Sequence, residues 1–538
     1  MIGADAMIKC LEAEGVKAVF GYPGVAICPF FNSIIDSKIE SILVRTEQNA
    51  AHAASGLARA AHTVGVCTVT SGPGATNLIT GIATAFADSI PLVCISGQVN
   101  SEQLGSDVFQ EADITGAVES FVKYSYLVKN ADDIPRIFKE AFYIANTGRK
   151  GPVLIDVPID IQNAPVKEFV YPEEVNLRTY KPTVKGHSVQ IKKVIKQLES
   201  AKRPVLYVGG GILLSDAQEK LLQFAEAHQI PVVSTMMGIG AMPTKHPLYF
   251  GMVGNNGKPY ANRAVREADV LIMIGARVAD RAVNQPELIT NDKVLVHIDV
   301  DPAEIGKNAG PHIPIVGDAG HVLEDLNSQE FKSSDTSEWL DTLNGYKTAM
   351  EPKRKEHPGF VDPAAFITEL SEKLPEDAIY VADVGQNQIW SCGYHIVKKG
   401  KFFTTGGMGT MGYSIPAAMG AKYISPEKQV VAVCGDGSFQ MSMMELATMK
   451  QHGIKSKIIV LKNNYLGMVR QYQHFTYKDN YSVVDLSGSP DLEMIAKAYD
   501  MPFKRVHDAS EVSAAIEELL ASDSSYLMEC LIDPMDLV

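Results

Sequence analysis

The sequence has no long apolar run, no excess of positive charge and no pairing pattern among its cysteines. No apolar stretch is long enough to span a bilayer, so a membrane-spanning helix is not expected. The first residues, "MIGADAMIKCLEAEG", lack the basic start and apolar centre of a signal peptide, and they predict an amphipathic helix. The net charge of −14 argues against nucleic acid as a partner. We therefore expect neither a membrane nor a nucleic acid among the partners.

The seven cysteines are scattered along the chain without a CxxC pair. Most of them lie in apolar surroundings, which is typical of small buried side chains rather than of disulfides or metal ligands. This usage fits a reducing compartment, and we expect a cytoplasmic protein.

The chain is long enough for several domains, and 46% of its 538 residues are apolar, which supports large cores. Apolar strands such as "IPLVCISG", "ADVLIMIGA" and "KIIVLKN" alternate with helical stretches. Such alternation predicts an α/β fold with three doubly wound parallel-sheet domains. The predicted parts are an N-terminal domain (1–164), a linker (165–187), a central domain (188–326), a second linker that is polar or helical (327–359) and a C-terminal domain (360–538).

The stretch "VVAVCGDGSFQ" places Asp436 between Gly435 and Gly437, directly after a β-branched apolar run. The run predicts an interior strand of a parallel sheet, and the residues after it predict a helix that stops at Gly453. Asp436 would then lie at the carboxyl end of a strand, where open α/β sheets bind ligands. A tight turn in which the aspartate caps the helix is the alternative interpretation.

Asn463 follows Asp436 by 27 residues and ends the next apolar run, "SKIIVLKNN". If the helix crosses back between neighbouring parallel strands, both side chains reach the same edge of the sheet. A carboxylate, an amide oxygen and a backbone carbonyl are ligands suited to Mg²⁺, which takes its remaining ligands from water and substrate phosphates. Gly435 and Gly437 would let backbone N–H groups approach those phosphates. The spacing therefore predicts a site for a magnesium ion and a diphosphate.

This unit resembles the thiamine-diphosphate signature, and the resemblance extends over nearly the whole chain. The strings that carry it are "FGYPG", "VTSGPGATNLITGIATAFADSIPLV", "FQEADI", "TGRKGPVLIDVP", "IDVDPAEIGKN", "GGMGTMGYSIPAAMGA" and "LGMVRQ". Together they are similar to the large, catalytic subunits of the acetolactate synthase (acetohydroxyacid synthase) family. The resemblance implies an enzyme that decarboxylates pyruvate and condenses the remainder with a second 2-oxo acid, either pyruvate or 2-oxobutyrate. That reaction is the first common step of branched-chain amino acid biosynthesis.

The same resemblance assigns roles at the thiamine site. Glu47, in "RTEQNAA", would hydrogen-bond N1′ of the cofactor's pyrimidine, Met411 would hold the cofactor bent, and the Gly409 carbonyl would accept from its 4′-amino group. Further expected cofactor contacts are Gly435, Gly437, Ser438, Asn463, Gly467 and Met468. The expected metal ligands are Asp436, Asn463 and Tyr465.

Substrate contacts are also implied by the resemblance. Phe109 and Gln110, in "DVFQEAD", match pocket positions, and Val25 belongs to a loop over the cofactor. Arg281 can bind a substrate carboxylate bidentately, although a salt bridge with Asp280 is the alternative. Tyr472 stands where the family usually has a tryptophan that helps to select the second substrate, so the preference between pyruvate and 2-oxobutyrate stays open.

The middle of the chain matches the family's flavin-binding region, so FAD is expected there in a structural role. Three consecutive glycines after a predicted strand, Gly209, Gly210 and Gly211, can approach a diphosphate. Five more residues fall where family members contact FAD: Arg149, Gly275, Arg277, Asp299 and Asp318.

Three other functions stay open at this point. The spelling "EQNAA" is closer to catabolic acetolactate synthases that work without flavin. Simple thiamine-dependent decarboxylases carry adjacent histidines, and none occur here. A diphosphate-binding protein without catalysis would have no use for Glu47. The resemblance also implies a homodimer or tetramer, with the Glu47 domain of one subunit facing the Asp436 domain of another, and a separate small regulatory subunit.

Overall fold

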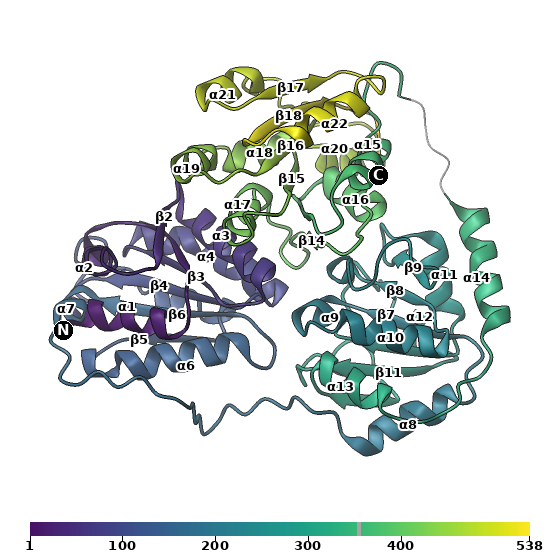
Figure 1. Ribbon diagram of the computed structural model, residues 1–538, viewed down its shortest axis with the longest axis horizontal. Coiled ribbons are helices and arrows are strands. Elements are labelled where there is room, and N and C mark those ends of the chain that lie inside the picture. The colour runs from purple at the N-terminus through teal and green to yellow at the C-terminus, as the bar shows by residue number, and fades with distance from the viewer. Residues whose placement is uncertain (284, 352–356) are drawn as a thin grey trace.

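The computed structural model describes residues 1–283, 285–351 and 357–538 of the chain. It contains three six-stranded sheets, and all strand pairs within them are parallel. Helices cover both faces of each sheet, and the three domains meet around a common centre (Figure 1). The predicted fold class is confirmed. Within the described ranges no helix has both the length and the apolarity needed to cross a membrane.

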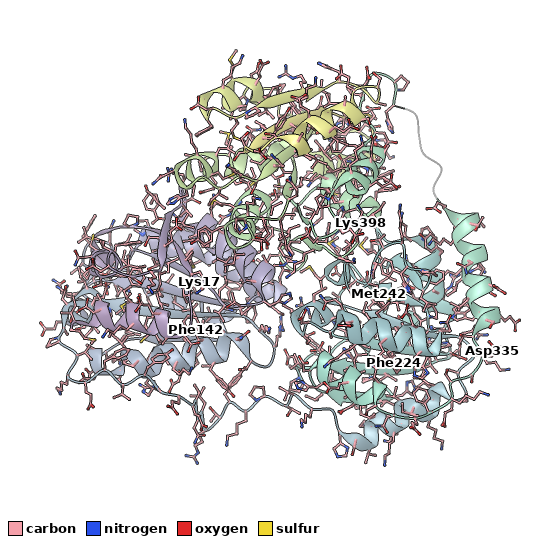
Figure 2. All side chains as sticks on the ribbon, viewed as in Figure 1. Lys17, Phe142, Phe224, Met242, Asp335 and Lys398 are labelled. Carbon is pink, nitrogen blue, oxygen red and sulfur yellow. The ribbon has the colours of Figure 1, made fainter. Side chains whose placement is uncertain are left out.

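The N-terminal domain has the strand order β2-β1-β3-β4-β6-β5. Its strands are β1 (Ala18–Tyr22), β2 (Glu40–Leu43), β3 (Gly65–Val69), β4 (Leu92–Gln98), β5 (Tyr124–Leu127) and β6 (Pro152–Pro158). Its helices are α1 (Gly3–Ala13), α2 (Cys28–Ser33), α3 (Glu47–Ala61), α4 (Pro73–Asp88), α5 (Ile114–Ala117), α6 (Ile134–Asn146) and α7 (Ile159–Asn163). One apolar core joins the sheet to α1 and α6, and Phe142 of that core is labelled in Figure 2.

The central domain has the order β12-β11-β10-β7-β8-β9. Its strands are β7 (Pro204–Val208), β8 (Val232–Ser234), β9 (Tyr249–Met252), β10 (Val270–Ile274), β11 (Val294–Asp299) and β12 (Ile313–Val316). Its helices are α8 (Ser188–Leu198), α9 (Gly210–Leu214), α10 (Gln218–His228), α11 (Pro259–Glu267), α12 (Glu287–Thr290) and α13 (Ala319–Asn327). Numbered within the domain, the order is 3-2-1-4-5-6, which is that of dinucleotide-binding sheets.

The C-terminal domain has the order β14-β13-β15-β16-β18-β17, which repeats the order of the N-terminal domain strand for strand. Its strands are β13 (Ile379–Ala382), β14 (Lys401–Phe403), β15 (Val430–Gly435), β16 (Lys457–Lys462), β17 (Phe503–Val506) and β18 (Tyr526–Leu531). Its helices are α15 (Pro363–Lys373), α16 (Gln386–Tyr394), α17 (Ser414–Ile424), α18 (Asp436–Ser442), α19 (Glu445–His452), α20 (Gly467–Tyr477), α21 (Leu492–Ala498) and α22 (Val512–Ala521).

Two connections join the domains. Residues 165–187 contain no helix and run from the N-terminal to the central domain along one side of the molecule (Figure 1). The second predicted linker, 327–359, includes α14 (Ser337–Met350), whose Trp339 and Leu343 are buried in a core of the central domain. Residues 352–356 of that linker lie outside the described residues. The domain boundaries therefore stay a prediction.

The N-terminal and C-terminal domains pack through α3 and α17. Small residues let these helices touch backbone to backbone, because a Cβ built on Gly56 would lie 1.9 Å from the Ala417 carbonyl oxygen, and one on Gly420 would lie 1.9 Å from that of Ala53. A single apolar core runs through the contact from one sheet to the other. The contact links the helix that begins at Glu47 to the helix that follows the Gly409–Met411 loop.

Candidate functional site

Asp436 lies at the carboxyl edge of the C-terminal sheet. β15 and β16 pair in parallel, with Gly435 opposite Leu461. The helix N-cap is Gly435, so Asp436 is the first helical residue and not the cap. Its carboxylate accepts from the backbone N–H of Asn464 at 2.7 Å and of Gly437 at 3.1 Å, and it is 4% exposed. Burial raises the pKa of Asp436 to about 6, against the lowering effect of these hydrogen bonds. The following helix is broken at Met443 and Met444 into α18 and α19, where a single helix had been predicted.

Asn463 reaches the same edge as Asp436. Its Oδ1 accepts from the Tyr465 N–H at 3.0 Å, and its Nδ2 donates to Gln386 Oε1 at 3.3 Å. No group of three His, Cys, Asp or Glu side chains able to hold a metal occurs in the described part of the chain. A cation here would therefore have one carboxylate, one amide oxygen and backbone oxygens, and would need phosphate oxygens to complete its shell. Those donors fit Mg²⁺ bound together with a diphosphate.

The N-terminus of α16 also borders this edge, which the sequence analysis missed. Gly385 precedes the helix with a φ of +135°. The Gln386 amide lies so close to Gly467 that a Cβ on this glycine would be 2.0 Å from Gln386 Oε1. Asn387 Nδ2 donates to the carbonyls of Asp383 and Val433, at the ends of β13 and β15. In the sequence, Gly385 shortly after the apolar run "AIYVAD" is the signal that could have predicted this helix start.

The Gly409–Met411 loop approaches the Asp436 turn. The buried carboxylate of Asp383 accepts from the N–H groups of Gly412 at 2.9 Å and Ser414 at 2.7 Å, and so fixes the loop. Gly409 has a φ of +66°, and a Cβ built on it would lie 4.0 Å from Val384 Cγ1. Met411 Cε lies 3.4 Å from the position that a Cβ of Gly437 would take. The Ser438 hydroxyl is used within the turn, where it bonds the backbone of Gly435. The structure thus brings Met411 and Gly437 together.

Glu47 is the first residue of α3, and the Thr46 side chain caps the helix. Its Oε2 accepts from Asn77 Nδ2 of α4 at 3.1 Å. Among the described residues no hydrogen bond or ion pair joins Glu47 to the C-terminal domain. Within one chain, therefore, Glu47 is not tied to Asp436.

The predicted substrate residues are open to solvent in the single chain. Phe109 is 88% exposed, Val25 75% and Tyr472 60%. Gln110 follows Phe109 with a φ of +60°, which is unusual for a residue other than glycine. No residue of α20, which carries Tyr472, is buried. In the single chain these side chains do not line the central cavity.

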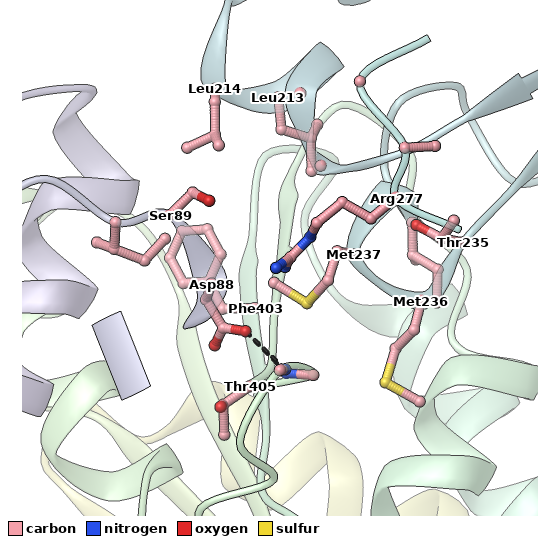
Figure 3. Close-up of a pocket in the computed structure, with 18 of the residues that line it drawn as sticks. Asp88, Ser89, Leu213, Leu214, Thr235, Met236, Met237, Arg277, Phe403 and Thr405 are labelled. Atoms are coloured by element: carbon pink, nitrogen blue, oxygen red, sulfur yellow. Dashed lines mark hydrogen bonds between the residues drawn. The ribbon is translucent and has the colours of Figure 1, made fainter. Parts of the chain in front are cut away.

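A cavity of about 750 Å³ lies where the three domains meet. It is lined by nearly all residues predicted for the flavin, and it reaches Gly409 and Met468 of the thiamine site. The predicted residues that line it are Arg149, Gly210, Gly211, Gly275, Arg277, Arg281, Asp299 and Asp318. Gly209 is not among them, because it packs against the Gly275 carbonyl. Figure 3 shows Arg277 extending from the central domain across this space toward Asp88.

The charged residues of the cavity are already partly engaged. Arg277 donates to the Ala87 carbonyl at 2.6 Å, and burial lowers its pKa. Arg149 pairs with Asp301 and Glu304, both at 3.3 Å. Burial raises the pKa of Asp299 to about 6. Asp318 accepts from the N–H groups of Gly320 and His321 and caps α13, so part of its role is structural.

The position of the cavity fits a dinucleotide. β7 and β10 are neighbours in the sheet but not in the sequence, and open α/β sheets bind ligands at such a switch point. Gly209 and Gly211 pack on Gly275 there, which lets the turn after β7 approach the end of β10. The volume is also in the range of cofactor pockets.

Three profiles of the thiamine pyrophosphate enzymes match the chain: the N-terminal TPP binding domain over residues 1–117, the central domain over 191–326 and the C-terminal TPP binding domain over 383–530. The chain belongs to this family. It is 44% identical to the probable acetolactate synthase large subunit of Methanocaldococcus jannaschii, over 100% of this chain and 93% of the relative. It is 44% identical to the acetolactate synthase large subunit of Corynebacterium glutamicum, over 96% and 84%. The large subunit of acetolactate synthase isozyme 3 from Escherichia coli is 42% identical, over 96% and 92%. Within the thiamine pyrophosphate enzymes the chain is therefore an acetolactate synthase relative along its whole length.

Proposed function

We propose that this chain is the catalytic subunit of an acetolactate synthase, which decarboxylates pyruvate and joins the remaining two carbons to a second 2-oxo acid. The full-length similarity to acetolactate synthase large subunits carries this proposal. The arrangement of Asp436, Asn463 and Met411 at one sheet edge supports it, because a protein that only retained the fold would have no need of this donor set.

At the carboxyl edge of the C-terminal sheet, Asp436, Asn463 and the Tyr465 carbonyl would hold Mg²⁺. Bound thiamine diphosphate would supply the carbanion that adds to a 2-oxo acid and the electron sink for the pair left by CO₂. Glu47 would hold a proton at the pyrimidine nitrogen. Its place beside Asn77, at the start of a helix, gives the carboxylate a fixed orientation.

The open residues at the mouth of the site would bind the 2-oxo acids. Arg281 would pair with a substrate carboxylate, since its guanidinium makes no ion pair among the described residues and faces the cavity. Phe109, Val25 and Tyr472 would exclude water, which strengthens electrostatic interactions in the site.

The central cavity would hold FAD in a structural role. Its position at the switch point of a 3-2-1-4-5-6 sheet, with Arg149 and Arg277 on its wall, supports a dinucleotide with a diphosphate. Seven free cysteines fit a reducing compartment and a cytoplasmic protein.

We further propose an assembly of at least two chains, because among the described residues no hydrogen bond or ion pair joins Glu47 to the C-terminal domain of its own chain. Because several relatives are named large subunits, a small regulatory subunit is also proposed.

The test is an assay of the purified protein with pyruvate, thiamine diphosphate and Mg²⁺, with and without FAD. Acetolactate that forms only with FAD supports the proposal in full. Acetolactate without FAD contradicts the flavin part, and acetaldehyde alone contradicts the carboligation.

A further inference from the structure

A buried polar cluster lies behind the loop that carries Phe109 and Gln110. It consists of Ser96, Gln98 and Asp156, none of them more than 2% exposed. None of the three lines the central cavity or the edge around Asp436. Apolar residues such as Cys94 and Leu154 occupy the preceding positions on the same face of β4 and β6. Burying three polar side chains at the end of such a face costs free energy, which indicates that they have a role there.

Hydrogen bonds connect the cluster to the loop. Ser96 and Asp156 are register partners on β4 and β6, and the Ser96 hydroxyl donates to Asp156 Oδ1 at 2.6 Å. Gln98 Nε2 donates both to Asp156 Oδ2 at 2.9 Å and to the Ala112 carbonyl at 2.8 Å. Gln98 Oε1 accepts from the Val99 N–H at 2.9 Å. The carboxyl group thus fixes the orientation of an amide that joins the two ends of residues 99–112.

The loop between these ends is held in a conformation that needs support. Asp160 accepts from the Ser101 N–H at 2.9 Å near its start. Gln110 has a φ of +60°. It lies so close to Gly72 that a Cβ built on this glycine would be 2.9 Å from the Gln110 carbonyl oxygen. Strained backbone of this kind persists only where its surroundings determine it.

We propose that Asp156 is a positioning residue, which holds residues 99–112 through Gln98 and thereby places Phe109 and Gln110 for the 2-oxo acid. This inference rests on the proposed function for its effect on catalysis, but not for its effect on the loop. The Asp156 carboxyl group is costly to ionise, because burial raises the pKa of Asp156 to about 7 and the nearby carboxylate of Asp113 raises it further. An apolar residue in place of Asp156 alone would leave the Ser96 hydroxyl and the Gln98 amide without their buried acceptor.

The experiment compares the full-length wild type with Asp156→Ala and with the conservative Asp156→Asn. The asparagine can still accept from Gln98 while its amide donates to the Ser96 hydroxyl. Asp5→Asn is the matched control, because Asp5 also accepts from a serine hydroxyl, Ser33 at 2.7 Å, but makes no hydrogen bond to residues 99–112 among the described residues. Hydrogen–deuterium exchange of residues 99–112 reports the loop, and kcat/KM for pyruvate and the Kd of thiamine diphosphate report the site.

In Asp156→Ala we expect exchange in residues 99–112 to become about tenfold faster, because a buried hydrogen-bond partner is lost. We expect kcat/KM to fall by about tenfold or more, with the Kd of thiamine diphosphate within about twofold of the wild type. Asp156→Asn should recover most of both losses, and Asp5→Asn should alter neither.

Faster exchange spread evenly over β4 and β6, with no excess in residues 99–112, would overturn the inference. So would wild-type kcat/KM in Asp156→Ala. If the wild type forms no acetolactate, the proposed function fails, while the exchange comparison still decides whether Asp156 holds the loop.

Discussion

Asp436 is the proposed cation ligand that carries a negative charge. The other proposed ligands at this sheet edge, Asn463 and the Tyr465 carbonyl, are neutral. We predict that Asp436→Asn weakens thiamine diphosphate binding in the presence of Mg²⁺ by about hundredfold, because the amide keeps the shape but not the charge that balances the ion. Calorimetric titration of the purified protein measures this. Asp500→Asn is the control, because Asp500 forms an exposed ion pair with Lys450. Equal affinity in the wild type and in Asp436→Asn would mean that Asp436 does not bind the cation.

Asp156 leads to a prediction on stability as well as on the loop. The pKa of Asp156 in the folded chain, about 7, lies above its ordinary value of 3.8. The folded state therefore binds more protons than the unfolded state between about pH 4 and pH 7, and the free energy of unfolding falls as pH rises through that window. Asp156→Asn has no carboxyl group to titrate at this position, so its free energy of unfolding lacks this contribution. We expect the wild type to lose stability relative to Asp156→Asn between pH 5 and pH 7.5, measured by urea unfolding. A constant difference between the two proteins would contradict it.

Among the helices, α3, which begins at Glu47, packs on α17, which follows the Gly409–Met411 loop. Gly56→Ala places a methyl group where the Ala417 carbonyl now lies, so the helices must separate. We predict a loss of about 1–3 kcal/mol in stability and a loss of activity, because Glu47 shifts with α3, and the loop of Met411 shifts with α17. Thermal unfolding and the acetolactate assay measure the two effects.

The control for this change is Gly345→Ala in α14, where no atom lies within 4 Å of the added methyl group. That variant should gain about 0.5–1 kcal/mol through its better helix propensity. If both alanine variants behave alike, close packing at Gly56 is not the cause.

The strands show what sequence patterns can and cannot predict. Interior strands such as β10 and β15 are buried on both faces, so their runs are apolar and were predicted. β5 and β17, at the sheet edges, are short and half-buried, and their sequences "YSYL" and "FKRV" carry no such signal. At the site, Asp436 and Asn463 could be predicted because they follow interior strands. Gln386 and Asp156 could not, because their hydrogen bonds join residues 77 and 58 positions apart.

In the whole molecule, the N-terminal and C-terminal domains share one strand order but carry different residues of the proposed site. Glu47 begins a helix of the first, and Asp436 begins a helix directly after a strand of the last. No described hydrogen bond joins Glu47 to its own C-terminal domain, and Val25, Phe109 and Tyr472 are exposed. A second copy with its Asp436 edge against Glu47 would complete two equal sites, as two-fold symmetry requires.

This arrangement predicts complementation between two inactive variants. Glu47→Gln and Asp436→Asn should each be inactive alone. In a dimer with one chain of each kind, one site would contain both substitutions and the other would contain neither. Unfolded together in equal amounts and refolded, or co-expressed, the two variants should recover about one quarter of wild-type activity, since half of the dimers are mixed and half of their sites are intact. Sites built within single chains would give none. Mixing each variant with itself under the same conditions is the control, and the acetolactate assay decides between the two arrangements.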